Sequence, residues 1–187
     1  YKNWVYACVE ARAEDVSDMK LRLFKDDEEI TEHPALDVIK KVNPYMTKHE
    51  FFHATQAFKD LDGNCFWFLA RDGEKEDGDI KEIYILRPDK VSIVLSKENP
   101  LLVQGYIYTQ TDGTKIPFSP KQIIHHRNFN PTAAHPLPHR GMSIVQAASW
   151  SVETDNEIRN WNYSFFKNSA KPAGILTYKG EDRKSVV

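Results

Sequence analysis

The segment from Gly141 to Gly174 constrains the fold of this chain more than any other stretch. Ser143 followed by Gln146 predicts a capping box at the start of a helix. No further glycine or proline occurs before Pro172, and the residue that precedes a proline is pushed out of the helical region. At about 1.5 Å per residue, a helix over residues 143–170 is roughly 40 Å long. Such a helix either crosses a whole domain or serves more than one body.

The faces of this predicted helix change along its length. Its middle turn, residues 153–157, is polar nearly all round, whereas its C-terminal end carries aromatic side chains. Two neighbouring stripes mix apolar and polar residues: Ile144, Ala148, Ser151, Asp155, Ile158, Asn162 and Phe165 on one, and Val145, Val152, Arg159 and Phe166 on the other. The distribution favours a helix that bridges elements or subunits. A surface helix with one apolar edge is the alternative.

Composition and charge limit the classes of partner. The chain has 187 residues, of which 41% are hydrophobic and 28% are charged, values typical of a globular protein with a sizeable core. Its 25 basic and 27 acidic residues give a net charge of -2, and no basic block stands out. Tight, static binding to nucleic acid needs a concentrated basic surface. The balance therefore argues against a basic-groove DNA-binding module, although it leaves room for a weak, sliding contact.

The cysteines and the hydropathy of the chain indicate its redox environment and argue against a membrane-spanning segment. Cys8 and Cys65, the only cysteines, each lie in an apolar run and are expected to be small core residues in a reducing compartment. No apolar stretch approaches the ~20 residues that a membrane span needs. The chain starts at Tyr1 and ends in charged residues, so we expect a fragment at both ends.

Three helices are expected before residue 63. The first covers residues 3–19, with a buried face made of Val5, Cys8, Val9, Val16 and Met19. The second begins at Pro34 and stops before Pro44. The third begins with a capping box, Thr47 to Glu50, and stops at Gly63; its apolar face is made of Phe51, Ala54, Phe58 and Leu61. Between the first two, residues 20–25 alternate as a short strand and residues 26–29 form an acidic, solvated hairpin end.

Antiparallel strands are expected to follow. Residues 64–71 are apolar on both alternating faces, which is typical of a central strand covered on both sides. Residues 80–86 are its hairpin partner, residues 91–95 follow a break at Pro88, and residues 103–110 and 115–118 flank a hairpin turn around Gly113. Residues 122–127 and 175–178 add two more strands. Helices followed by antiparallel strands predict an α+β fold.

The search for catalytic chemistry finds no recognisable motif. Among the seven histidines, His125, His126, His135 and His139 lie closest together, but His125 and His126 point to opposite faces of a predicted strand. The sequence contains no G-x-S-x-G and no glycine-rich phosphate loop. We therefore expect no catalytic, cofactor or metal residues. A metal-dependent nucleic-acid-processing enzyme that uses the histidine-rich segment remains the alternative.

Several stretches in order carry a resemblance over nearly the whole chain. They include N-P-Y-M-T-K-H-E-F-F from residue 43, L-R-P-D-K-V from residue 86, Q-I-I-H-H-R-N-F-N-P from residue 122, G-M-S-I-V-Q-A-A from residue 141 and W-N-Y-S-F-F-K-N from residue 161. Together they closely resemble the portal protein family of tailed bacteriophages and prophages. The family often has proline after the capping serine, where this chain has Ile144.

The resemblance implies a structural, non-enzymatic role. Proteins of this family form dodecameric rings at one capsid vertex, bind the terminase, the head-tail adaptor and capsid proteins, and conduct double-stranded DNA without sequence specificity during packaging and ejection. It implies a virion location, with host cytoplasm during assembly, and neither a cofactor nor a membrane contact. Residues 1–180 would form the wing-like domain with three short N-terminal helices and one long helix. Residues 181–187 would begin a stem whose remainder, with the clip and tunnel loop, is absent.

The same resemblance points to one assembly segment, at the C-terminal end of the long helix. Its candidate residues are Trp161, Asn162, Phe165, Phe166, Lys167 and Asn168. We interpret Trp161, Phe165 and Phe166 as a packing hinge between the wing core and the ring, and not as a ligand site.

Overall fold

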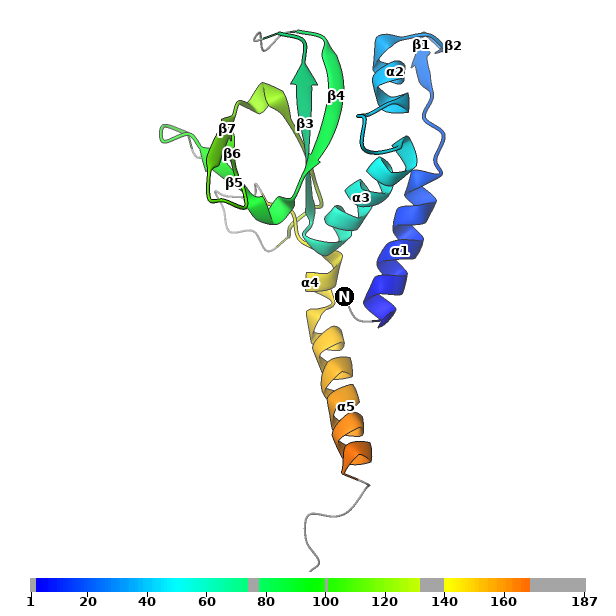
Figure 1. Ribbon diagram of the computed structural model, residues 1–187, viewed down its shortest axis with the longest axis vertical. Coiled ribbons are helices and arrows are strands. Elements are labelled where there is room, and N and C mark those ends of the chain that lie inside the picture. Colours follow the sequence, from blue (N-terminus) through cyan, green and yellow to red (C-terminus); the bar gives the residue numbers. More distant parts are fainter. Residues whose placement is uncertain (1–2, 74–77, 100, 132–139, 169–187) are drawn as a thin grey trace, which may run out of the picture. The chain divides into compact units, whose positions relative to one another are not determined.

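A computed structural model describes residues 3–73, 78–99, 101–131 and 140–168. The chain divides into two compact units, Tyr1–Ser149 and Trp150–Val187. The first contains both larger sheets and the helices that cover them, and the second contains nearly all of the long C-terminal helix (Figure 1). Helices and antiparallel sheets are both present, so the predicted α+β class is confirmed.

The centre of the first unit is strand β3 (Asn64–Arg71). It pairs with β4 (Ile80–Leu86) on one side and with β8 (Ile123–Arg127) on the other, both antiparallel, in the order β4-β3-β8. Phe66 lies opposite Leu86 in one pairing and opposite His125 in the other. The prediction that this strand is central is confirmed, and so is its hairpin partner.

A second three-stranded sheet covers one face of this strand. Its strands are β5 (Val91–Leu95), β6 (Val103–Thr109) and β7 (Lys115–Phe118), in the order β5-β6-β7. Short 3-10 turns, η1 (Pro88–Lys90) and η2 (Pro120–Gln122), lead into β5 and β8. Phe66 packs between the two sheets in a buried cluster with Val91, Tyr106 and Ile123. Pro88 and Gly113 mark the break and the turn that the sequence predicts.

Two helices, α2 (Pro34–Lys40) and α3 (Lys48–Leu61), cover the opposite face of β3. Here Leu69 is buried with Val42, Phe51 and Ile83, and Trp67 packs against this cluster. Phe66 and Leu69 point to opposite sides of the strand, where the second sheet buries Phe66 and the helices bury Leu69. The strand therefore carries apolar residues on both faces, without the alternation of apolar and polar residues that a half-exposed strand shows. The first unit therefore has three layers, helix–sheet–sheet (Figure 1).

The capping box of α3 is present as predicted. The Thr47 N–H donates to Glu50 Oε2 at 2.8 Å, and the Glu50 N–H donates to Thr47 Oγ1 at 3.2 Å. The bond from the Thr47 backbone also lowers the pKa of Glu50. At the other end Gly63, at φ +84°, stops the helix and donates to the Lys59 carbonyl.

The buried face of α3 differs from the prediction. Phe51 is buried, but its fully buried companions are polar, Thr55, Gln56 and Asp60; Ala54, Phe58 and Leu61 are only half-buried. These polar groups are buried at low cost because they are paired: Asp60 accepts hydrogen bonds from Gln56 at 2.8 Å and from Arg12 at 2.9 Å.

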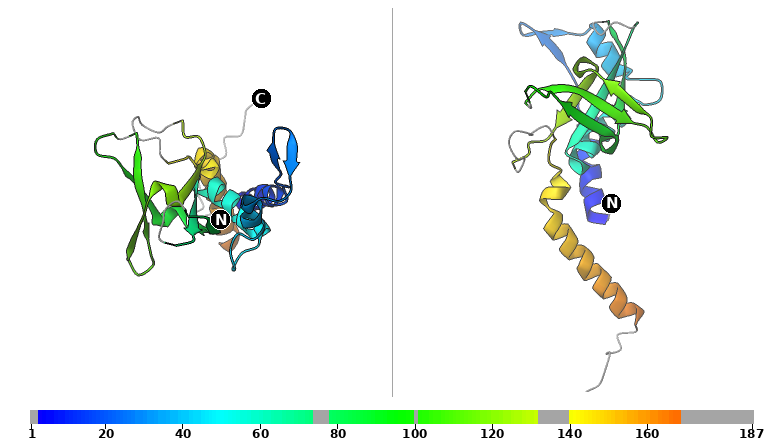
Figure 2. Two further views of the ribbon diagram at one scale, coloured as in Figure 1. Left: turned by 90° about the horizontal axis from the view of Figure 1, so that it is seen from above. Right: turned by 90° about the vertical axis from the view of Figure 1, so that its left-hand side faces the viewer.

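Helix α1 (Asn3–Ser17) lies alongside α3 (Figures 1 and 2). Its buried residues are Val9, Ala13 and Ser17, so the predicted face is confirmed for Val9 but wrong for Cys8, which is exposed, and for Met19, which is 55% exposed. Small side chains at these positions let the two helix axes approach, whereas hydrophobic periodicity alone favoured the larger residues. Polar side chains interact at the edges of this helix–helix contact; for example, His53 Nε2 lies 3.1 Å from Glu10 Oε2.

The hairpin of β1 (Leu23–Lys25) and β2 (Glu28–Ile30) turns at Asp26 and Asp27, which have positive φ. The predicted hairpin end is confirmed, although Glu28 and Glu29 belong to the second strand. The first strand also begins at Leu23, later than the predicted residue 20.

The predicted long helix is interrupted at Ala148. A short helix, α4 (Ile144–Ala147), precedes α5 (Ser149–Lys167), and Ala148 leaves helical geometry at φ −96°, ψ 12°. Ser143 caps α4 and accepts from the Gln146 N–H at 3.0 Å, but the reciprocal bond of the predicted capping box, from the Ser143 N–H to the Gln146 side chain, is not formed. The Ser143 hydroxyl also donates to the Asp60 carbonyl at 3.0 Å, which ties the start of α4 to α3. The expected helix end near Pro172 and the strand at residues 175–178 lie outside the described residues.

The two cysteines should differ sharply in reactivity. Cys65 is fully buried, and burial raises the pKa of its thiol from 9.0 to about 12, whereas Cys8 is exposed, contrary to its predicted core position. At neutral pH a disulfide reagent should modify the Cys8 thiol quickly and the Cys65 thiol only after unfolding. Cys8→Ser should abolish the fast phase and Cys65→Ala should leave it unchanged; two fast thiols would contradict the burial of Cys65.

The raised pKa also sets a pH window for stability. The protonated, buried Cys65 thiol makes its full contribution to the free energy of unfolding below about pH 9. This contribution is lost as the pH rises toward 12, because the thiol ionises more easily in the unfolded chain than in the folded one.

Candidate assembly site

The predicted assembly residues lie together at the C-terminal end of α5. Trp161 is 66% exposed, Phe165 43% and Phe166 75%, and α5 has no buried residue. Trp161 and Phe165 stack with ring centroids 5.5 Å apart, and Phe165 meets Phe166 edge-on at 5.9 Å. The polar candidates Asn162, Lys167 and Asn168 are exposed as well.

Two exposed aromatics of α5, Trp150 and Tyr163, were missed in the assembly prediction. Trp150, 81% exposed, lies eleven residues before Trp161, which places both on the same side of a 3.6-residue helix. That spacing was readable from the sequence. Contiguous exposed apolar surface of this kind marks an interaction site.

The chain enters α4 through a backbone crossing of two glycines. A Cβ atom on Gly63 would lie 2.5 Å from the Met142 carbonyl carbon, and one on Gly141 would lie 2.7 Å from the Asn128 nitrogen and closer still to the Gly63 oxygen. Real Cβ atoms essentially never come so close. Only glycine therefore fits at the two positions, which join the end of α3 to the segment before α4.

Asn64 holds this crossing together from inside. Its side chain is fully buried: Nδ2 donates to Asp62 Oδ1 at 2.7 Å and to the Gly141 carbonyl at 3.3 Å. Its Oδ1 accepts from the Gly141 N–H at 2.7 Å and contacts His125 Nε2 at 3.0 Å. One amide thus binds groups from the end of α3, from β8 and from the entry to α4, which is the geometry of a rigid joint.

Arg140 extends the same joint toward the second sheet. Its guanidinium donates to Asp62 Oδ1 at 2.9 Å and to the carbonyls of Pro88 and Val91 at 3.2 Å. Asn128 adds a bond to the Lys59 carbonyl at 2.8 Å. Sequence reasoning found none of these polar residues, because their partners are distant in the chain.

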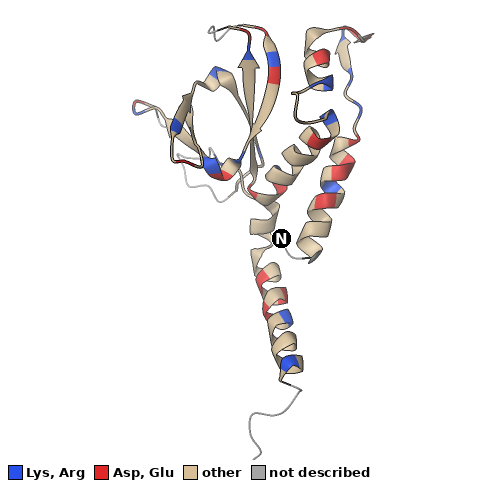
Figure 3. Cartoon of the chain, viewed as in Figure 1, with Lys and Arg blue, Asp and Glu red and all other residues tan. Residues whose placement is uncertain are grey.

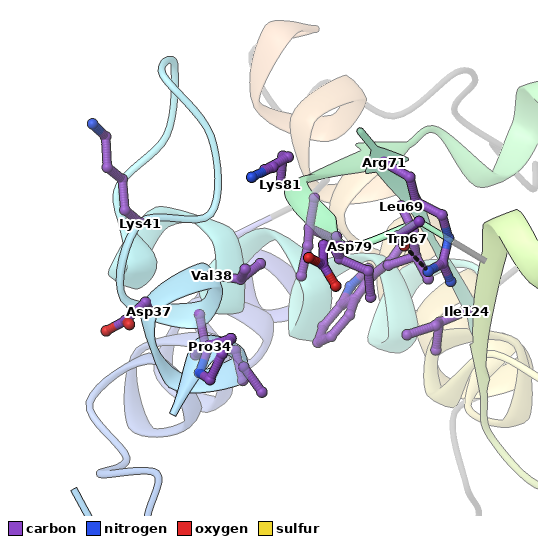
Figure 4. A pocket seen from close by; sticks show the side chains of 15 residues that line it. Pro34, Asp37, Val38, Lys41, Trp67, Leu69, Arg71, Asp79, Lys81 and Ile124 are labelled. Carbon is purple, nitrogen blue, oxygen red and sulfur yellow. Dashed lines mark hydrogen bonds between the residues drawn. The ribbon is translucent and has the colours of Figure 1, made fainter. Parts of the chain in front are cut away.

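A hollow of about 790 Å³ opens between α2 and the helix-facing side of the β4-β3-β8 sheet (Figure 4). Trp67, Leu69 and Ile124 line its sheet side, and charged residues such as Asp37 and Lys81 also line it. It forms because the seven-residue helix α2 leaves part of this sheet face uncovered. Among the described residues that line it, no nucleophile is paired with a base.

The histidines of β8 have structural contacts. His125 stacks on Phe66 at 4.3 Å and His126 packs on Trp67 at 4.2 Å, on opposite faces as predicted. Burial, and then the charge of Lys59, lowers the pKa of His126. No group of three or more metal-ligating side chains occurs in the described part of the chain, which does not include His135 or His139.

Charges of both signs are scattered over the elements, and no element is uniformly basic (Figure 3). Within the described ranges, no helix is both long enough and apolar enough to cross a membrane.

Comparisons with known proteins agree over nearly the whole chain. The family model described as "Phage portal protein" matches residues 3–186. Two relatives, uncharacterized proteins of Rickettsia bellii (strain RML369-C) and Rickettsia felis (strain ATCC VR-1525 / URRWXCal2), are each 28% identical over 182 and 183 residues respectively. Each alignment covers 94% of this chain and 44% of the relative.

Solved structures of gene transfer agent (GTA) particles share the fold. A chain from the neck of an empty GTA particle, computed with C6 symmetry, has a TM-score of 0.76 and 27% identity, and the match covers 99% of this chain and 48% of that one. A chain from the neck of the native particle, computed with C12 symmetry, has a TM-score of 0.71 and 25% identity over 97% and 46%. The chain spans less than half the length of these relatives. By the extent of the family match, this chain belongs to the phage portal protein family.

Proposed function

We propose that this chain is the wing-containing part of a structural subunit of a portal ring at the vertex of a phage or phage-like particle. One observation carries the proposal: the fold matches, over 97% of the chain, a chain in the neck of a particle solved with C12 symmetry. Membership of the portal family over residues 3–186 supports it.

The finer points of the proposal follow the family. The full-length subunit forms a dodecamer, located in the virion and, during assembly, in the host cytoplasm. Residues 1–180 form the wing-like domain and residues 181–187 begin the stem. Terminase, head-tail adaptor and capsid proteins bind through regions largely outside these residues, and double-stranded DNA passes during packaging and ejection.

The near-neutral net charge of the chain supports the passage of DNA without tight binding. A net charge of -2 and interspersed signs provide no concentrated row of cations to neutralise phosphates. DNA can then slide past such a subunit with little sequence preference. The proposed role is non-catalytic, and the described lining of the hollow beside α2 offers no nucleophile–base pairing that would favour an enzyme.

The test is the mass of the full-length protein in solution. We expect rings of uniform subunit number in mass photometry, with a central channel in electron micrographs. A protein that remains monomeric at all concentrations and ionic strengths would contradict the proposal.

Variants of the aromatic end test its share in assembly. Trp161→Ala or Phe165→Ala should weaken ring formation by about tenfold or more, as for an interface hot spot. The melting temperature of the monomer should hardly change, because Trp161 is 66% exposed within the chain. Phe129→Ala, at an 85% exposed aromatic in the first unit, is the control and should assemble normally.

A further inference from the structure

The apolar residues of α5 fall into two stripes with coiled-coil spacing. The tryptophan stripe consists of Trp150, Thr154, Ile158, Trp161 and Phe165; the tyrosine stripe consists of Val152, Asn156, Arg159, Tyr163 and Phe166. Each set advances by three or four residues at a time, as the seam positions of packed helices do. At about 100° per residue, the centres of the two stripes lie roughly 160° apart, on opposite sides of the helix.

Both stripes present large side chains to solvent within the chain. In the tryptophan stripe Trp150 is 81% exposed and Ile158 54%; in the tyrosine stripe Tyr163 is 68% exposed and Phe166 75%. Val152 and Arg159 are half-buried. Helix α5 has no buried residue and carries apolar side chains on two sides. A single partner helix can cover only one of these sides.

The charges beside the stripes are complementary. Glu157 lies next to the tryptophan stripe, whereas Glu153 lies midway between the stripes, roughly 100° from the centre of each. Arg159 belongs to the tyrosine stripe, and Lys167 lies over the Tyr163 ring at 5.9 Å. Asp155, bonded to Arg159 at 2.7 Å, offsets only part of this positive charge. One side of the helix is thus acidic and aromatic, and the other is more basic and aromatic.

Two different, complementary sides on one helix suit a second copy of the same helix. A twofold dimer would cover one stripe with its own copy and leave the other stripe exposed. Head-to-tail contacts avoid this and close into rings. Glu157 and Arg159 differ in height by only about 3 Å along the axis, so copies related by rotation alone can pair them.

We propose that in the ring, whose existence rests on the proposed function, the α5 helices of neighbouring subunits pack side by side. The tryptophan stripe of one subunit contacts the tyrosine stripe of the next, and Glu157 of the first pairs with Arg159 of the second. Each subunit uses both stripes, one toward each neighbour.

Charge reversal in the full-length protein tests the pairing. Glu157→Arg alone and Arg159→Glu alone each place like charges at every contact, and each should lower the fraction of assembled rings by about tenfold or more. An equimolar mixture of the two variants should restore rings to near the wild-type level, because alternating subunits then pair opposite charges at every contact. A mixture no better than either variant overturns the proposal.

Cross-linking tests the geometry independently of charge. In a Cys8→Ser background, a mixture of Glu157→Cys and Arg159→Cys proteins should give covalent dimers with a short bismaleimide. A mixture of Asn160→Cys and Asn162→Cys, whose side chains lie between the stripes, is the matched control and should give at least fivefold fewer. Equal yields would overturn the side-by-side arrangement.

The outcomes separate this inference from the proposed function. Wild-type rings that tolerate both charge reversals would show that other parts of the chain cover the stripes, and the portal role would stand. Failure of the wild-type protein to form any ring would refute both. Circular dichroism of each variant, unchanged from wild type, shows that α5 is still folded.

Discussion

Replacing Gly63 with alanine is expected to lower the free energy of unfolding by about 2–5 kcal/mol. Two costs combine. Gly63 has φ +84°, a left-handed conformation that costs a residue with a Cβ about 1–2 kcal/mol. The new Cβ would also lie 2.5 Å from the Met142 carbonyl carbon, and overpacking against backbone costs about 1–3 kcal/mol or more. Urea denaturation measures the sum.

Two further glycines separate these costs. Gly113 has φ +89° with nothing within 4 Å of a built Cβ, so Gly113→Ala should cost only the conformational part, about 1–2 kcal/mol. Gly141 has no left-handed φ but meets the Asn128 nitrogen at 2.7 Å, so Gly141→Ala reports the steric part alone. If Gly63→Ala were no worse than Gly113→Ala, the backbone crossing would not exist as described.

Asn64→Asp should have a comparably large effect, about 3–5 kcal/mol at neutral pH. The substitution keeps the shape and Oδ1, but it turns the donor Nδ2 into an oxygen that faces Asp62 Oδ1 at 2.7 Å and the Gly141 carbonyl at 3.3 Å. A carboxylate would then be fully buried against two acceptors, and the nearby cation, Arg140, is already bonded to Asp62.

The pH dependence identifies the cause. An Asp carboxyl at position 64 would have a pKa above its unfolded value, because only the protonated form can donate to Asp62 or Gly141. The penalty relative to wild type should therefore shrink as the pH falls and grow as it rises through the folded pKa. Asn99→Asp is the control: its exposed Oδ1 only accepts, from Leu101, so this change should be nearly neutral at every pH. A pH-independent loss at Asn64 would argue against the buried charge.

Much of the secondary structure could be read from local patterns. Residues 64–71 are apolar on both faces, and the strand is indeed covered on both sides. Thr47 and Glu50 specify their own hydrogen bonds within one turn of helix, so the start of α3 was predictable. Both inferences depend on neighbours in sequence, where the physical rules are strongest.

Buried faces were less predictable, because they depend on a partner. Periodicity ranked Met19 and Cys8 above Ala13, yet the contact of α1 with α3 selects small residues. Asp60 reads as a surface carboxylate, and it is buried because Arg12 reaches it from another helix. The interruption of the long helix at Ala148 has no local signal either, since Ala148 is a good helix former.

The exposed aromatic group at the end of α5 could be recognised from the sequence. Trp161, Phe165 and Phe166 do form such a group. Their role in assembly and their interpretation as a hinge between wing and ring stay predictions. Trp150 and Tyr163, which the prediction left out, belong to the same helix, and the polar turn at residues 153–157 obscured the continuity of Trp150 with the aromatic end.

By itself, the sequence determined the α+β class, the central strand, the capped helices and the aromatic end of the last helix, because each follows from residues within a few positions of one another. Only the tertiary structure decided that Gly63 and Gly141 cross in backbone contact and that Asn64 bonds to Gly141, 77 residues away. Local chemistry limits what a segment can form. Which segments meet depends on close packing and on the pairing of every buried polar group, and those conditions are met only when the whole chain has folded.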